Sequence, residues 1–108
     1  MSSAEQHFKR ISNSLAHEHE HVSQGKMMSS DGIRYRDKFF AFFYKDEMVF
    51  KLGRESEPSE FGVNEFSLLS PFKTRPPMKD WFQIPYSEAD HWDKLARHAL
   101  QRMRAELK

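Results

Sequence analysis

The sequence predicts an α+β fold in which helices cover one face of an antiparallel sheet. Three observations lead to this prediction. Each end of the chain carries an amphipathic helical pattern, the middle alternates β-rich segments with short polar turns, and the length of 108 residues suits one core. A chain of this size buries roughly two-thirds of the surface that it exposes when unfolded, which is enough for one domain. We therefore expect residues 1–108 to form a single domain.

The composition is that of a polar chain around an aromatic core. There are 17 Lys and Arg against 16 Asp and Glu, and 10 Phe, 3 Tyr and 2 Trp accompany a mean hydropathy of −0.82. A net charge of +1 gives no electrostatic signature of a nucleic-acid or membrane surface, and the absence of cysteine excludes disulfides and thiolate sites. No apolar segment approaches the ~20 residues of a membrane helix. We expect a cytoplasmic protein without membrane association.

The first helix is expected over residues 3–22. Ser3 and Gln6 fit a capping box, in which the two side chains satisfy backbone donors at the start of a helix. Gly25 is expected to follow the end of this helix. The predicted buried face has three-four spacing and consists of Phe8, Ile11, Leu15 and Val22.

A three-stranded antiparallel meander is expected next. Its strands are predicted over residues 26–36, 39–44 and 47–52, separated by the polar pairs Asp37-Lys38 and Lys45-Asp46. The middle strand is apolar on both faces, so both of its faces need to be covered.

The second half of the chain is predicted to contain a short helix that starts at Pro58, a proline-rich loop over 66–78 and a strand over 81–86. A capping box from Ser87 to Asp90 predicts the start of the last helix. Its apolar stripe comprises Trp92, Leu95, Ala96, Ala99, Leu100, Met103 and Leu107.

Histidines alternate with glutamates over residues 17–21. On a helix, His17 and His21 lie one turn apart and are the candidate ligands of a divalent cation. A zinc site needs three or four protein ligands, and no motif supplies the others. The favoured interpretation is a solvated helix end, with no metal and no cofactor.

Two further histidines, His91 and His98, share one side of the last helix, with Arg102 one turn beyond. This spacing suggests a general base beside an anion clamp, but the interpretation as a solvated helix face is favoured. The sequence contains no glycine-rich phosphate loop or nucleophile elbow. We therefore expect a protein that is not an enzyme.

The segment 38–44 is similar to the aromatic strand with which RNA-recognition motifs stack bases, but it lacks the glycine of that motif. Core packing, or burial of the second sheet face in a dimer, is favoured. Trp81 is expected to anchor the chain where it returns to the sheet. The candidate interface residues are Phe40, Phe42, Tyr44 and Trp81.

A small basic loop carries the candidate anion or partner contacts Lys73, Arg75 and Lys79. These side chains could hold a carboxylate or phosphate, although pairing with Asp80 or with the glutamates of residues 55–65 is favoured. Nucleic-acid binding would combine them with the basic end of the last helix, which contains Arg97, Arg102 and Arg104.

Several segments together resemble small bacterial proteins similar to the N-terminal domain of the TfoX/Sxy competence regulators. The resemblance covers residues 25–103. The segments that carry it are Gly25-Lys26-Met27-Met28, Asp31-Gly32, Lys38-Phe39-Phe40-Ala41-Phe42, Asp46-Glu47-Met48-Val49-Phe50-Lys51-Leu52, Arg75-Pro76-Pro77-Met78-Lys79-Asp80-Trp81, Trp92 and Leu95-Ala96.

The resemblance implies an architecture like that of the YjbR/MmcQ proteins, an α-β(3)-α-β(2)-α two-layer sandwich of the secretion-chaperone-like type. It places two strands within residues 66–86 and brings no catalytic residues. We expect a non-enzymatic regulatory or protein-interaction module that binds a protein partner or forms a homodimer. The alternatives are a nucleic-acid-associated regulator and a small-ligand module with its pocket between the sheet and the Pro76-Pro77 loop.

Overall fold

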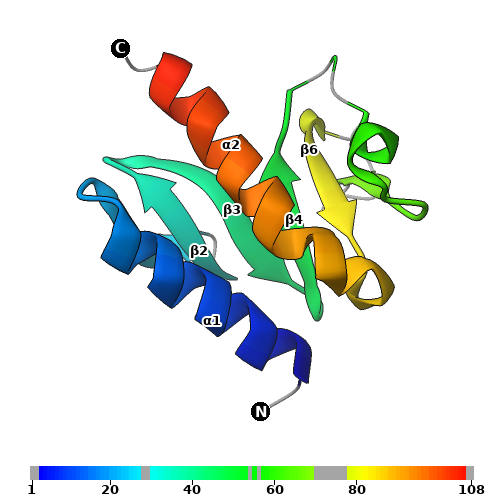
Figure 1. Ribbon diagram of the computed structural model, residues 1–108, viewed down its shortest axis with the longest axis horizontal. Helices are drawn as coiled ribbons and strands as arrows, with labels where there is room; N and C mark the ends of the chain where they lie inside the picture. The colour runs from blue at the N-terminus through cyan, green and yellow to red at the C-terminus, as the bar shows by residue number, and fades with distance from the viewer. Residues whose placement is uncertain (1–2, 28–29, 54, 56, 70–77, 107–108) are drawn as a thin grey trace.

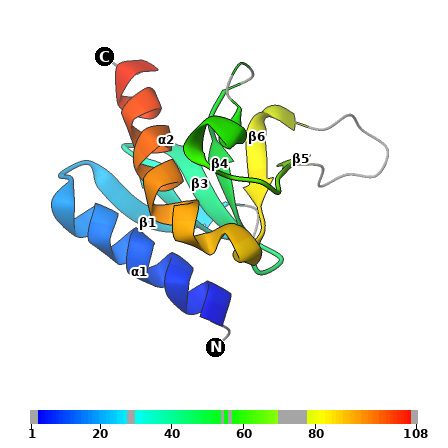
Figure 2. The same ribbon diagram turned by 45° about the vertical axis from the view of Figure 1, so that its right-hand side comes forward.

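The computed structural model describes residues 3–27, 30–53, 55, 57–69 and 78–106. It has the expected α+β architecture, with an antiparallel six-stranded sheet in the order β1-β2-β3-β4-β6-β5 and both α-helices on one side of it (Figures 1 and 2). In chain order the elements are α1 (Ser3–Glu18), β1 (Val22–Met27), β2 (Ser30–Tyr35), β3 (Lys38–Tyr44), β4 (Glu47–Lys51), the 3₁₀ turn η1 (Pro58–Phe61), β5 (Ser67–Leu69), β6 (Met78–Ile84), the 3₁₀ segment η2 (Tyr86–His91) and α2 (Trp92–Glu106).

The first helix is shorter than predicted. It ends at Glu18, and Val22 begins β1 instead of extending the helical stripe. The next position of the three-four pattern after Leu15 is Glu18, which is exposed, so the last turn of the helix adds no apolar side chain to the stripe. Val22 is buried as part of β1 instead. The prediction that Gly25 terminates the helix is wrong, because Gly25 lies within β1 opposite Gly32.

The meander therefore contains one more strand than predicted. Val22–Met27 and Ser30–Tyr35 form two strands, β1 and β2, where a single strand over residues 26–36 was predicted. The turn at Lys45 and Asp46 is where it was predicted, and both residues have positive φ angles of 51° and 63°, as the common two-residue hairpin turn requires.

The last helix starts later than predicted, at Trp92. The residues of the predicted capping box lie in η2, where Glu88 has a non-helical backbone. The Ser87 hydroxyl donates to Glu65 at 3.5 Å, and Glu88 accepts a hydrogen bond from the backbone of Asn64 at 3.0 Å. Both side chains thus bind the segment after η1. The two strands that the resemblance implied within 66–86 are present as β5 and β6.

The main core lies between the helices and the sheet. Both helical stripes face it, and Met48, Phe50 and Leu52 are fully buried in it. Trp92, the first residue of α2, belongs to this core. Its ring centre lies 5.4 Å from that of His7 and 5.7 Å from that of Tyr86. None of the helices in the described part of the chain has the length and apolar content to cross a membrane.

Candidate functional site

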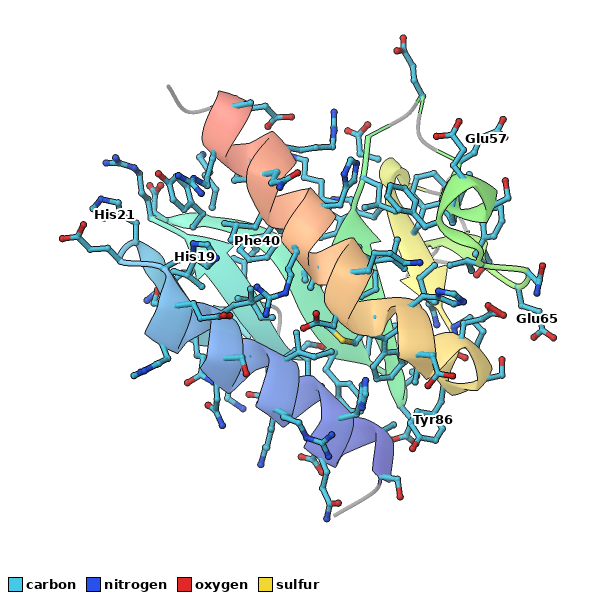
Figure 3. The ribbon with its side chains drawn as sticks, viewed as in Figure 1. His19, His21, Phe40, Glu57, Glu65 and Tyr86 are labelled. Atoms are coloured by element: carbon cyan, nitrogen blue, oxygen red, sulfur yellow. The ribbon has the colours of Figure 1, made fainter. Side chains whose placement is uncertain are left out.

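A β-bulge decides which side chains of β3 face the helices. The pairing with β2 shifts by one residue, so Phe40 is an extra residue between Phe39 and Ala41. Phe40 and Ala41 consequently both enter the main core, where both are fully buried, and Figure 3 labels Phe40 there. The prediction that Phe40 belongs to the same interface as Phe42 and Tyr44 is wrong, because strict alternation fails across the bulge.

A second apolar cluster occupies the sheet face that is turned away from both helices. Phe42, Val49 and Trp81 form its centre, and Phe39 and Tyr44 pack half-buried around them. The ring of Phe42 lies 5.3 Å from Trp81 and 6.3 Å from Tyr44. We call these five residues the aromatic face. It contains three of the four predicted interface residues, Phe42 and Tyr44 on β3 and Trp81 on β6.

Polar groups surround the aromatic face. Gln83 donates a 2.6 Å hydrogen bond to Glu47, and the Arg34 guanidinium donates a 2.9 Å bond to the hydroxyl of Ser23. Lys45 places its ammonium 5.2 Å from the ring centre of Tyr44. An aromatic centre within a satisfied polar rim is the usual anatomy of a protein interface.

Phe39 extends the aromatic face across two glycines of the neighbouring strands. A Cβ atom at Gly32 would lie 2.8 Å from the Phe39 ring, and one at Gly25 would lie 3.3 Å from it. The ring thus fills the space that the absent side chains leave. Sequence reasoning missed this packing, although two glycines opposite each other in adjacent strands are the signal that could have revealed it.

Of the predicted basic residues, the structure describes the side chains of those on α2. Lys73 and Arg75 lie outside the described residues, as does the side chain of Lys79. Arg97 donates 2.9 Å hydrogen bonds to Asp93 and to Glu18, which raises the pKa of Arg97 and ties α2 to α1. Two carboxylates already satisfy this guanidinium, so it is a poor phosphate ligand.

The predicted His17 and His21 pair is separated by the end of α1. His21 lies in the turn after the helix, where its ring meets Tyr35 edge-on at 6.0 Å (Figure 3). The i,i+4 geometry on which the chelate depended is therefore lost. Across the described residues, no group of three or more His, Asp or Glu side chains is arranged to hold a metal ion.

The pair His98 and Arg102 has a more structured environment than the predicted solvated helix face. Both are half-buried, and they line a cavity of about 500 Å³ between α2, η1 and the end of β4. The ring of Phe61 lies 4.7 Å from that of His98. His91 is not part of this cavity, because its ring packs over Gly62.

Comparison of the chain with known proteins adds no relative to this description. No family model, curated protein or solved structure matches it.

Proposed function

We propose that the chain is a non-enzymatic protein-interaction module that pairs with a second copy of itself through the aromatic face. The observation that carries the proposal is the second apolar cluster, centred on Phe42, Val49 and Trp81, on the side of the sheet away from α1 and α2. A sheet face of this composition packs well against another sheet at about 10 Å. Tyr and Trp are typical interface anchors, and this face carries Tyr44 beside the central Trp81.

The rim of the aromatic face suits pairing between identical chains. A two-fold interface must be self-complementary, since each patch meets its own copy. Arg34 and Lys45 contribute positive charge to the rim and Glu47 contributes negative charge, so opposite signs can meet across the axis. The chain carries a net charge of only +1, so repulsion between whole molecules is weak. A regulatory role, as the resemblance to TfoX-type domains suggests, would act through such a pair.

Sedimentation velocity over a wide concentration range tests the proposal. The weight-average mass of the wild-type chain should rise with concentration from the monomer mass of 12.9 kDa towards twice that value. Tyr44→Ser and Phe39→Ser should each keep the chain monomeric at concentrations where the wild type pairs, because each removes a half-buried aromatic from the face.

Phe66→Ser provides the matched control. Phe66 is 42% exposed, but its ring lies beside Phe82, whose side chain belongs to the core on the other side of the sheet. This variant should pair like the wild type. A wild-type chain that stays monomeric throughout, or a loss of pairing in Phe66→Ser but not in Tyr44→Ser, would overturn the proposal.

A further inference from the structure

We propose that the cavity between α2 and η1 is a binding site for a small zwitterion, a ligand that carries both a carboxylate and an ammonium group. The site is separate from the aromatic face, and the inference does not rest on pairing. We call it the α2–η1 pocket. It is lined by Lys51, Leu52, Gly53, Glu55, Glu60, Phe61, Asp80, His98, Arg102 and Glu106.

The wall beside Arg102 is built from backbone. The amides of Leu52 and Gly53 both donate to the carbonyl of Asp80, at 3.0 and 3.2 Å, which fixes the end of β4 against β6. Gly53 has a φ angle of +92°, and a Cβ atom there would lie 2.6 to 2.7 Å from the atoms of the Arg102 guanidinium. The guanidinium therefore rests on Gly53, which holds it in place at the pocket.

Arg102 has hydrogen-bonding capacity to spare. Its side chain is 35% exposed, and among the described residues the nearest carboxylate oxygen belongs to Glu106, at 3.9 Å. That distance is too long for a hydrogen bond. A guanidinium has five N–H donors in a planar fork that matches a carboxylate, so Arg102 is the group that would hold the acid end of a ligand.

His98 lines the pocket together with groups of both charges, among them Arg102 on α2 and Glu60 on η1. Burial and the charge of Arg102 lower the pKa of His98, while Glu60 acts in the opposite direction. The imidazole therefore stays neutral at pH 7 and can donate through one nitrogen and accept through the other. Arg102 on α2 and Glu60 on η1 both act on the ring of His98. A ligand beside His98 would therefore be close to a positive and a negative group.

The charges of the lining favour a ligand with both signs. Four carboxylates line the pocket with the two cations Lys51 and Arg102. A simple anion would meet an excess of carboxylates, and a simple cation would leave the spare donors of the Arg102 guanidinium without a partner. A zwitterion satisfies both parts, with its carboxylate on Arg102 and its ammonium at Glu60. The volume of about 500 Å³ lies within the range of small-molecule sites, and Phe61 offers an apolar wall.

NMR titration of the full chain with the free α-amino acids tests the inference, with the ring signals of His98 as the readout. At least one amino acid should shift these signals saturably, with a Kd below about 1 mM. The amine and the carboxylic acid that share the side chain of the strongest binder should each bind at least about tenfold more weakly, as expected when one charged hydrogen bond is lost.

Variants separate this site from general surface binding. Arg102→Gln and Glu60→Gln should each weaken binding about tenfold, whereas Arg104→Gln, at an exposed position on the same helix, should bind like the wild type. Glu60 is exposed, so its variant tests the site even where loss of Arg102 impairs folding. The inference is overturned if no amino acid shifts the His98 signals, if the amine or the acid binds as tightly as the zwitterion, or if Glu60→Gln binds unchanged.

Discussion

Both faces of the sheet bury aromatic side chains, but different parts of the molecule cover them. On the helix-covered face, Phe40 and Phe50 are fully buried in a core that both helices close. On the other face, Phe42 and Trp81 are buried almost as deeply, at 2% and 8% exposure, but the residues that pack around them are half-buried aromatics of the sheet itself. Deep burial on the first face reflects folding of one chain. On the second face it comes from neighbouring side chains of the sheet, because both α-helices lie on the other side.

One extra residue in β3 determines which of its side chains lie on each face of the sheet. Without the bulge in β3, Phe40 would share a face with Phe42. The bulge turns Phe40 inward and leaves Phe39 outward, over Gly25 and Gly32. An apolar run with no alternation is thereby divided between a core and a candidate interface.

The largest expected effect comes from the two sides of the bulge. Phe40→Ala should lower the free energy of unfolding by about 3–5 kcal/mol, because it opens a cavity in the closed core. Phe39→Ala should cost only about 1–2 kcal/mol, because the half-buried ring loses less buried area. Urea denaturation followed by circular dichroism measures both. Equal losses would mean that the two faces are not distinguished as described.

The next effect concerns the glycines beneath Phe39. Gly32→Ala should destabilise the chain by about 1–3 kcal/mol, because its new methyl group would lie 2.8 Å from the ring and 3.2 Å from the carbonyl of Ala41. Gly25→Ala is the matched control and should cost less, since the ring is 3.3 Å away and only its tip must move. Thermal unfolding of both variants checks the order, and a larger loss in Gly25→Ala would contradict the packing of Phe39.

A smaller loss of stability is expected when Arg97 is removed, because it pairs with Glu18 on α1 and with Asp93 on its own helix. Arg97→Ala should cost less than about 1 kcal/mol, because Arg97, Glu18 and Asp93 are all substantially exposed to solvent. The loss should shrink at high salt, where surface charges are screened. Denaturation at low and high salt measures this, with Arg104→Ala as the control. A loss that is large and independent of salt would indicate packing instead.

The smallest effect is a pH dependence from His98. Burial and Arg102 lower its pKa in the folded chain, so the unfolded chain binds the proton more readily. Stability is therefore unaffected by this group above its ordinary pKa and falls as the pH drops below it, through the folded pKa. Denaturation curves at pH 7 and pH 5 should show a slightly smaller acid loss for His98→Gln than for the wild type. A larger acid loss in the variant would reverse the sign.

The sequence allowed the fold class to be predicted because the features behind it are local. The stripe from Trp92 to Met103 and the turn at Lys45-Asp46 follow from periodicity and turn chemistry, and both are present in the structure. The ends of the helices were less predictable. Whether residues after Glu18 continue a helix or start β1 depends on pairing with β2, which is a tertiary contact.

The sites were predicted only in part for the same reason. Phe42, Tyr44 and Trp81 share a face as expected, but the bulge at Phe40 has no distinctive residue to announce it. The α2–η1 pocket depends on Arg102 resting on Gly53, two residues far apart in the chain. Helical spacing predicts that His98 and Arg102 lie close together. It does not predict that η1 and the end of β4 form the opposite side of the pocket.

The most direct test of pairing through the aromatic face uses the two tryptophans. Trp81 lies on that face and Trp92 lies in the closed core, so their indole N–H signals report on the two sides of the sheet. In a dilution series of ¹H–¹⁵N spectra of the full chain, the Trp81 indole and the amides of Tyr44 and Val49 should shift with concentration while the Trp92 indole stays in place. Stationary signals from Trp81 throughout the series, or shifts confined to Trp92 and α2, would contradict the account.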